Sequence, residues 1–309
     1  MLSKNSLLYA TTAYAPLIWG ATYIITSQML PPGTPLLDAV LRALPAGLLL
    51  LALTRTLPRG SWWWRSLVLG TLNIGAFFAL LFIGATLLPG GVAATLGAIQ
   101  PLLVSLLAHG LLGEKLSTRR VLAALLGMLG VGLLVLQAQA RLDPLGVLAA
   151  LGGAVSMALG VVLSKRWGQP ARPLATTAWQ LIWGGIVLLP ALFLVEGLPT
   201  TPLTPLNLWG FALLSLAGTA LAYALWFRGI SRLPVSRTAF LGLLSPLSAV
   251  LLGWIILGQS LSPGQLCGAA LVILALAWAI VPPRRRTRSD SATPPPFGVL
   301  PLEDCAKIR

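Results

Sequence analysis

The chain has 309 residues, of which 57% are hydrophobic and only 9% are charged, and its mean hydropathy is +0.88. A soluble domain carries charge on about a quarter of its residues, so this composition excludes a soluble protein and predicts a membrane protein that crosses the bilayer many times. The net charge of +14 lies mostly in short loops between apolar runs, which excludes a nucleic-acid-binding groove.

Ten apolar segments are each long enough to form a spanning helix of about 20 residues. The predicted fold class is therefore an all-α membrane protein with ten transmembrane helices and short loops rich in Pro, Gly and Arg. The predicted spans cover residues 8–30, 35–53, 66–86, 90–112, 120–136, 145–164, 174–195, 208–227, 234–257 and 263–281.

Basic residues gather in every second loop. Because Lys and Arg near span ends stay in the cytoplasm, this pattern predicts that both termini are cytoplasmic. The final residues, 284–309, begin with the cluster RRRTR and are Pro-rich and polar, so they are predicted to form a disordered cytoplasmic tail. The predicted cytoplasmic loops contain Arg55, Arg59 and Arg65; Lys115, Arg119 and Arg120; Lys165, Arg166 and Arg172; and Arg228, Arg232 and Arg237.

The two halves of the chain resemble each other. A shift of 145 positions lays LLPGGVAATLGAIQPLLVSLLAHGLLGEKLS over RLPVSRTAFLGLLSPLSAVLLGWIILGQSLS, and about 17 of 39 aligned pairs are identical when ALLFIG is laid over ALWFRG as well. The sequence therefore predicts a duplication, with one repeat in residues 1–140 and the other in residues 141–283.

Each half contains five predicted spans, which is an odd number, so the second copy must enter the membrane in the opposite sense to the first. Two such inverted repeats are typical of secondary transporters, in which the copies exchange conformations and expose a central site to each side in turn. The duplication therefore predicts alternating access, with the substrate near the middle of the membrane.

Polar and aromatic side chains near the middle of the spans are candidates for substrate binding. A buried amide in hydrocarbon must face protein or a wet cavity, and deep aromatic rings suit a ligand of modest size. The alternative for each residue is packing, because interhelical hydrogen bonds contribute about 0.6 to 2 kcal/mol. The candidates are Trp19, Tyr23, Asn73, Phe77, Phe78, Gln100, Met157, Trp179, Gln180, Trp183, Tyr223 and Ser245.

Charged and helix-breaking residues give further candidates. Arg42 and His109 are possible charged contacts, although Arg42 is also placed to snorkel and a lone His is more often structural. Pro101 and Pro246 occupy equivalent places in the two copies and are predicted to be hinges. With one His and no carboxylate in the middle of a span, neither a metal site nor a catalytic cluster can be assembled, and no cofactor-binding motif is present.

The pattern formed by Pro89, Pro101, Leu102, Gly113, Glu114 and Leu116 resembles the EamA repeat of the drug/metabolite transporter superfamily. The segment WGATYI at residues 19–24, together with Arg42, is similar to the first two spans of that family. The resemblance covers nearly all of residues 8–281 and extends to YddG-type amino-acid exporters. The second copy departs from the pattern at Gln259, which replaces the acid that matches Glu114.

The resemblance implies ten helices in two inverted halves around a central cavity, and export of amino acids, aromatic ones among them, from a bacterial cell through the inner membrane. The expected partners are an amino-acid substrate and the lipid bilayer, without nucleic acid. The protein is expected to be a monomer, and it is not expected to be an enzyme. Two alternatives stay open: a transporter of a drug or a sugar phosphate, and a membrane enzyme or receptor.

Overall fold

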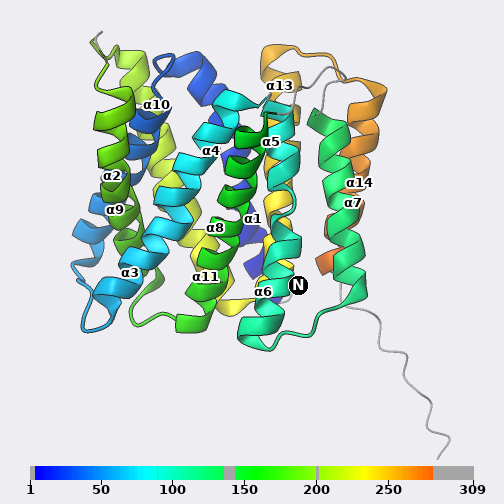
Figure 1. Cartoon of the computed structure of the whole chain (residues 1–309), viewed down its shortest axis with the longest axis horizontal. Helices are drawn as coiled ribbons and strands as arrows, with labels where there is room; N and C mark the ends of the chain where they lie inside the picture. The colour runs from blue at the N-terminus through cyan, green and yellow to red at the C-terminus, as the bar shows by residue number, and fades with distance from the viewer. Residues whose placement is uncertain (1–3, 89, 136–142, 200–201, 281–309) are drawn as a thin grey trace, which may run out of the picture.

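The computed structural model describes residues 4–88, 90–135, 143–199 and 202–280, which form helices joined by short loops (Figure 1). In these residues, nine segments are helical, at least 18 residues long and apolar enough to cross a membrane. Helix α1 (Lys4–Met29) has 26 residues, more than the roughly 20 that a span needs, and completes the set. The prediction of an all-α protein with ten spanning helices is confirmed.

Several spans of the first half consist of more than one helical segment. The third span begins at Trp62, four residues before its predicted start, and contains a π-helical turn, whereas the fourth span is interrupted after Gly97. The segments of the first half are α1, α2 (Pro35–Thr54), α3 (Trp62–Gly70), η1 (Thr71–Gly75), α4 (Ala76–Leu87), α5 (Gly90–Gly97), α6 (Gln100–Leu112) and α7 (Thr118–Val135).

The second half repeats this construction. Its third span also contains a π-helical turn, and its fourth span passes through a short 3₁₀ helix. Its segments are α8 (Pro144–Trp167), α9 (Pro173–Ala191), η2 (Leu192–Glu196), α10 (Pro205–Ser215), η3 (Leu216–Leu221), α11 (Ala222–Arg232), α12 (Val235–Thr238), η4 (Ala239–Leu243), α13 (Leu244–Leu257) and α14 (Pro263–Ile280).

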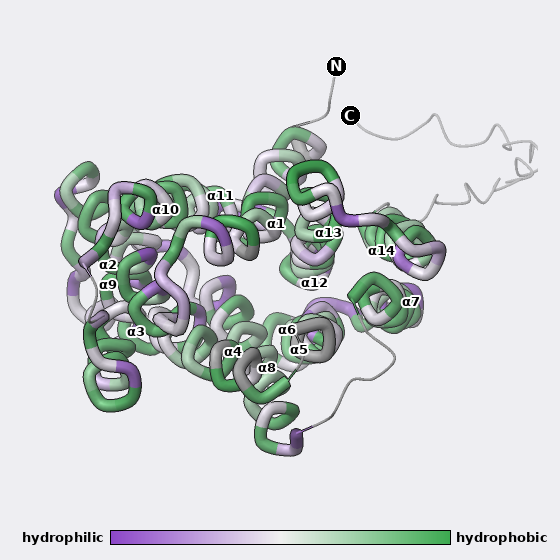
Figure 2. Tube along the Cα trace, turned by 90° about the horizontal axis from the view of Figure 1, so that it is seen from above, coloured by the Kyte–Doolittle hydropathy of each residue, from purple (hydrophilic) through white to green (hydrophobic). Residues whose placement is uncertain are grey.

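The helices pack as two copies of one arrangement, inverted relative to each other. Helix α2 packs against α9 and α7 against α14, so each of these spans meets its own counterpart. Helix α1 packs against α11 and α13, and α8 makes the matching contacts with α4 and α6. From above, the α7–α14 pair and the α2–α9 pair stand at opposite edges of the molecule (Figure 2). The predicted boundary near residue 140 and the predicted tail 284–309 lie outside the described residues.

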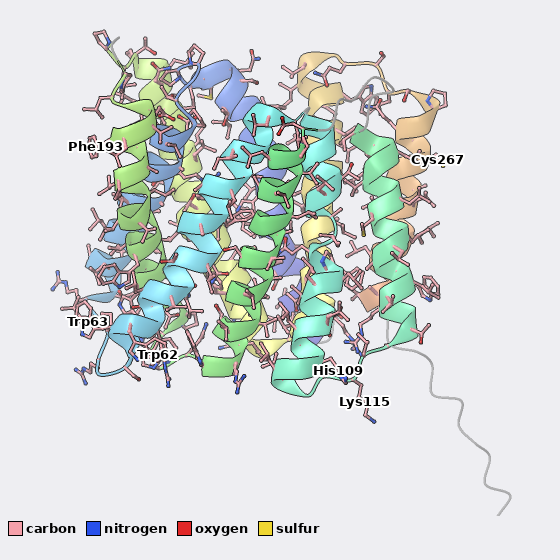
Figure 3. The ribbon with its side chains drawn as sticks, viewed as in Figure 1. Trp62, Trp63, His109, Lys115, Phe193 and Cys267 are labelled. Atoms are coloured by element: carbon pink, nitrogen blue, oxygen red, sulfur yellow. The ribbon has the colours of Figure 1, made fainter. Side chains whose placement is uncertain are left out.

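The basic loops lie at one end of the helices, which we call the basic face. The labelled side chains Trp62, His109 and Lys115 lie at this end, whereas Phe193 and Cys267 lie in the opposite half (Figure 3). The turn between α11 and α12 and the loop between α8 and α9 join the same end, because consecutive spans run in alternating directions (Figure 1).

Equivalent residues in the last three spans of each half are 145 positions apart. Helix α6 ends at Gly113 and α13 at Gly258, both with positive φ angles, 68° and 64°, which glycine adopts without strain. The π-helical turns η1 and η3 obey the same spacing, because η1 begins at Thr71 and η3 at Leu216. These two irregularities thus recur at matching places in both copies, whereas the π-helical turn η2 occurs, within the described residues, only in the second.

The first two spans of each half follow a different spacing of 138 positions, since Thr12 contacts Gly229 as Ala150 contacts Gly84. The second and seventh spans show this spacing as well. Both begin at a proline, Pro35 and Pro173, whose fixed φ suits the first helical turn. Gly47 and Gly185, twelve residues further on in each helix, lie where α2 and α9 touch. The second copy is longer by seven residues between this proline and its π-helical turn, Pro173 to Leu216 against Pro35 to Thr71, so an ungapped comparison of the halves cannot align these spans.

Glu196 fixes where α2 begins. Its two carboxylate oxygens accept hydrogen bonds from the backbone N–H groups of Leu36 and Leu37, at 2.7 and 2.9 Å. The first turn of a helix has no intrahelical partners for these groups, and its partial positive charge favours an anion. The end of η2 is therefore joined to the start of α2.

Replacing Gly184 by alanine is expected to destabilise the protein by about 1–3 kcal/mol, because a Cβ at this position would lie 2.4 Å from the Cβ of Ile74 and 2.8 Å from the carbonyl oxygen of Gly70. Gly110→Ala, in a helix with nothing within 4 Å of the new Cβ, is the matched control. Thermal unfolding in detergent measures the difference, and equal stability of the two variants would contradict the close contact of α9 with η1.

Candidate functional site

Arg42 lies in the interior of the bundle and contacts the π-helical segment η3. Its side chain is buried, with Nε donating to the hydroxyl of Thr219 at 3.2 Å and Nη2 to the carbonyl oxygen of Gly218 at 3.4 Å. The guanidinium carbon also lies 5.0 Å from the ring centre of Phe78, within the range of a cation–π contact. Arg42 therefore does not snorkel to the membrane surface, which was the alternative open from the sequence.

Aromatic rings from α1 and α11 lie beside the same segment. Trp19 packs against Tyr223 and Trp226, with ring centres 5.1 and 5.4 Å apart, and its Nε1 donates to the carbonyl oxygen of Gly218 at 3.1 Å. Tyr223 and Trp226 are 2% and 1% exposed, so their rings lie fully inside the protein. We call Trp19, Arg42, Phe78, Tyr223 and Trp226 the central cluster.

The π-helical turn η3 explains how one carbonyl serves two side chains. In a π-helix the wider backbone spiral displaces carbonyl groups from regular α-helical geometry, and such turns occur often at functional sites. Here the carbonyl oxygen of Gly218 accepts hydrogen bonds from both Arg42 and Trp19, which belong to different spans.

The inverted copy contains a matching junction with different chemistry. Asn73, the counterpart of Gly218, donates from Nδ2 to Oε1 of Gln180 at 2.8 Å and to the hydroxyl of Ser164 at 3.3 Å. Gln180 is the counterpart of Arg42 at the spacing of 138, and at the same spacing the counterpart of Trp19 is Met157, while Ser164 is an additional partner of Asn73. The inverted symmetry thus relates a cationic and aromatic junction to a neutral amide junction.

Asn73 and Gln180 are buried and hydrogen-bonded to each other, with exposed fractions of 0% and 4%. Their contacts agree with the packing alternative, although Oδ1 of Asn73 is buried without a hydrogen-bond partner among the described residues. A role for this pair in substrate binding remains a prediction.

The structure distributes the other aromatic and apolar candidates over several places. Phe77 packs against Phe78, with ring centres 5.6 Å apart, and so lies next to the central cluster. Trp179 donates from Nε1 to the carbonyl oxygen of Thr56 at 2.7 Å, near the basic face. Trp183 packs on Gly70, and Met157 is buried in the core. The side chain of Tyr23 lies outside the described residues.

The predicted hinge prolines coincide with breaks in regular α-helix. Pro101 is in the first turn of α6, after residues 98 and 99 have left the helical pattern. Pro246 follows the 3₁₀ helix η4 at the start of α13. Gln100 and Ser245, the candidates beside these prolines, are both half-buried. Motion at these breaks remains a prediction.

His109 lies at the basic face, away from the central cluster in the interior (Figure 3). It is exposed near the end of α6 at the basic face, and its Nδ1 lies 3.0 Å from the carbonyl oxygen of Glu114 (Figure 3). The structure therefore brings Arg42 into the cluster but not His109.

Four members of these two junctions were not among the sequence candidates: Ser164, Gly218, Thr219 and Trp226. Gly218 and Thr219 are small residues whose role depends on the π-helical turn, which no periodicity predicts. Trp226 has a buried Nε1 without a hydrogen-bond partner among the described residues, and the hydroxyl of Thr22, one turn after Trp19, shares this property.

Two cavities lie outside the central cluster. One is water-sized, about 10 Å³, and lies toward the basic face, lined by Ser164, Gln180, Thr176 and Ser231 among others. The second, about 550 Å³, lies between α5, α7 and the start of α14 and includes Thr95 and Met128 in its lining. Among the described residues no group of three or more His, Cys, Asp or Glu side chains is placed to hold a metal ion.

Comparisons with known proteins agree with this architecture. The EamA-like transporter family matches residues 7–136 and 144–281. Protein PecM of Dickeya dadantii is 46% identical over 265 residues, which is 85% of this chain and 89% of PecM. Uncharacterized transporter YvbV of Bacillus subtilis is 30% identical over 271 residues, covering 85% and 88% of the two chains. A crystal structure with 22% identity and a TM-score of 0.76 covers 90% of this chain and 98% of the other, and shows the fold alone.

Proposed function

Because this chain belongs to the EamA-like transporter family, we propose that it exports amino acids, aromatic and other neutral ones, and related small metabolites through a bacterial inner membrane. The basic face is the cytoplasmic side in this proposal, since loops rich in Lys and Arg remain there. Both termini then lie in the cytoplasm, and transport proceeds by alternating access between the two inverted halves.

The central observation is the burial of Arg42 among aromatic rings at the middle of the protein. A guanidinium can donate two parallel hydrogen bonds to a carboxylate, which gives both affinity and orientation. The faces of Phe78 and Tyr223 offer an apolar surface for the body of the same molecule. A carboxylate joined to an apolar or aromatic body describes a neutral amino acid.

Two buried donors around Trp19, one on the adjacent Trp226 and one on the next turn of α1, support a ligand at this place. Nε1 of Trp226 and the hydroxyl of Thr22 are buried without hydrogen-bond partners among the described residues. An unsatisfied buried polar group costs about 1–3 kcal/mol, so such groups are uncommon unless something else satisfies them. A polar substrate that enters the cluster would give these donors partners.

Charge at the matching junction favours a carboxylate over a phosphate. The counterpart of Arg42 is the neutral Gln180, so the inverted symmetry supplies one guanidinium and not two. A sugar phosphate carries close to two negative charges and would favour further cations in the same site. A substrate with a single negative group fits the cluster better.

Purified protein in liposomes tests this proposal. Radiolabelled phenylalanine, tryptophan and threonine should each cross the membrane faster than in protein-free liposomes, with and without an imposed pH gradient. A sugar phosphate and a cationic drug serve as alternative substrates in parallel. Flux of either alternative without flux of any amino acid would overturn the proposed substrate class.

A further inference from the structure

The turn that joins the eighth and ninth spans, residues 231–236, is held by side chains from two other spans. Lys165, near the end of α8, donates from Nζ to the carbonyl oxygens of Ser231 at 2.8 Å and Leu233 at 3.0 Å. These carbonyls lie at the end of α11, where backbone oxygens have no further helical partners. An ammonium group therefore closes this end of the helix.

Glu114, from the loop after α6, binds the other side of the same turn. Its carboxylate accepts from the backbone N–H of Val235 at 2.9 Å and of Ser236 at 3.4 Å, and from the hydroxyl of Ser236. Arg120 pairs with this carboxylate at 3.7 Å and also donates to the hydroxyl of Ser236. The contact joins residues more than 100 positions apart and connects the first repeat with the second.

The charges match the helix ends that they meet. A cation at the carbonyl end of α11 and an anion at the N–H end of the ninth span both interact favourably with the backbone dipoles. Hydrogen bonds to charged groups are roughly twice as strong as those between neutral groups. Glu114 and Arg120 are also largely shielded from solvent, with side-chain exposures of 20% and 14%, which limits screening by salt.

The counterpart of this turn, at the opposite face, lacks these charges. At the spacing of 145, Gln259 replaces Glu114, and Gly90 and Gly91 stand where Val235 and Ser236 would be. At the spacing of 138 that relates the first and sixth spans, Ser27 replaces Lys165. The side chain of Gln259 folds back over its own helix, because its Oε1 would lie 2.5 Å from a Cβ added at Gly253. Helix α6 packs against α12 at the basic face, whereas the ribbons of their counterparts α13 and α5 stand apart (Figure 2).

We propose that Glu114, Arg120 and Lys165 form a clamp that holds the basic face closed, and that the lack of these charges at the counterpart turn makes closure toward the cytoplasm the resting state. This inference rests on the proposed alternating access. Opening toward the cytoplasm then requires the turn 231–236 to separate from both charged groups. The cavity that includes Thr176 and Ser231 adjoins this turn, since Ser231 belongs to both, and its volume of about 10 Å³ is too small for an amino acid.

Cysteine labelling tests the clamp without measuring transport. Thr176→Cys, 4% exposed in the parent protein, is the reporter in a background with Cys267→Ser and Cys305→Ser. A membrane-impermeant maleimide is added to the cytoplasmic side of inside-out vesicles. Glu114→Gln should raise the labelling rate about tenfold, the size expected when one hydrogen bond to a charged group is lost.

Lys115→Gln is the matched control, because it removes a charge from the same loop at an exposed position whose side chain does not contact the turn. Lys165→Met should accelerate labelling as Glu114→Gln does, and it decides the question if the latter variant does not insert. Labelling of both variants at the rate of Lys115→Gln would overturn the clamp. Faster labelling in a protein that moves no amino acid would support the clamp and contradict the proposed substrate.

Discussion

Replacement of Arg42 by methionine is expected to lower amino-acid flux about 10- to 100-fold, because a hydrogen bond to a charged group contributes about 1.5–3 kcal/mol and each 1.4 kcal/mol is a factor of ten. Arg42→Lys retains the charge but loses the planar pair of donors. Its flux should therefore lie between that of the parent protein and that of Arg42→Met. Uptake of radiolabelled substrate into proteoliposomes at matched protein content measures the change.

Arg228→Met is the control for charge, because Arg228 is an exposed residue near the basic face. Thr219→Val removes the hydroxyl that accepts a hydrogen bond from Nε of Arg42. It should lower the flux less than Arg42→Met does, mainly by weakening the apparent affinity for the substrate. Thermal unfolding and gel filtration establish that each variant is folded. A folded Arg42→Met protein that transports at the normal rate would remove Arg42 from the substrate site.

Asn73→Leu is expected to destabilise the fold by about 1–3 kcal/mol, because it leaves the side chain of Gln180 buried without its partner. The double variant Asn73→Leu with Gln180→Leu should regain part of this loss, since removing both partners of a buried hydrogen bond is less costly than removing one. Thermal unfolding in detergent of the parent, the two single variants and the double variant gives the coupling free energy between Asn73 and Gln180.

Asn207→Leu serves as the comparison, because this amide lies in the capping box at the start of α10, outside the two junctions. If Asn73→Leu unfolds at the temperature of the parent and instead loses flux, Asn73 contacts substrate and the packing interpretation fails. Independent effects of the two leucine substitutions would contradict the hydrogen bond itself.

The sequence predicts the spanning helices and their inverted arrangement well, since long apolar runs and a repeated pattern of Pro and Gly depend on local chemistry alone. Arg42 was also identified, because a guanidinium inside a span is rare and costly. The helix ends were less predictable. The third span begins at Trp62, four residues before its predicted start, and the eighth ends at Arg232, five residues after its predicted end.

Relations between distant spans could not be predicted. The equivalence of Arg42 and Gln180 depends on a change of spacing from 145 to 138, which an ungapped comparison of the two halves cannot detect. Lys165 is interpreted from the sequence as a loop charge that sets orientation and Glu114 only as part of the repeat pattern, because nothing local indicates that their side chains converge on one turn. The structure shows that the partner of Glu114 is a backbone turn in the other repeat.

The π-helical turns η1 and η3 also carry information about ancestry. They stand at matching positions in copies that share few residues at these turns, TLNIG in one and LAGTAL in the other. A single origin before the gene duplicated explains this agreement more simply than two separate insertions. The ancestral five-helix protein then already had a displaced carbonyl facing its interior, and two such proteins in opposite orientations formed a pore with two identical junctions. The arginine of one junction and the amides of the other record how the copies later diverged.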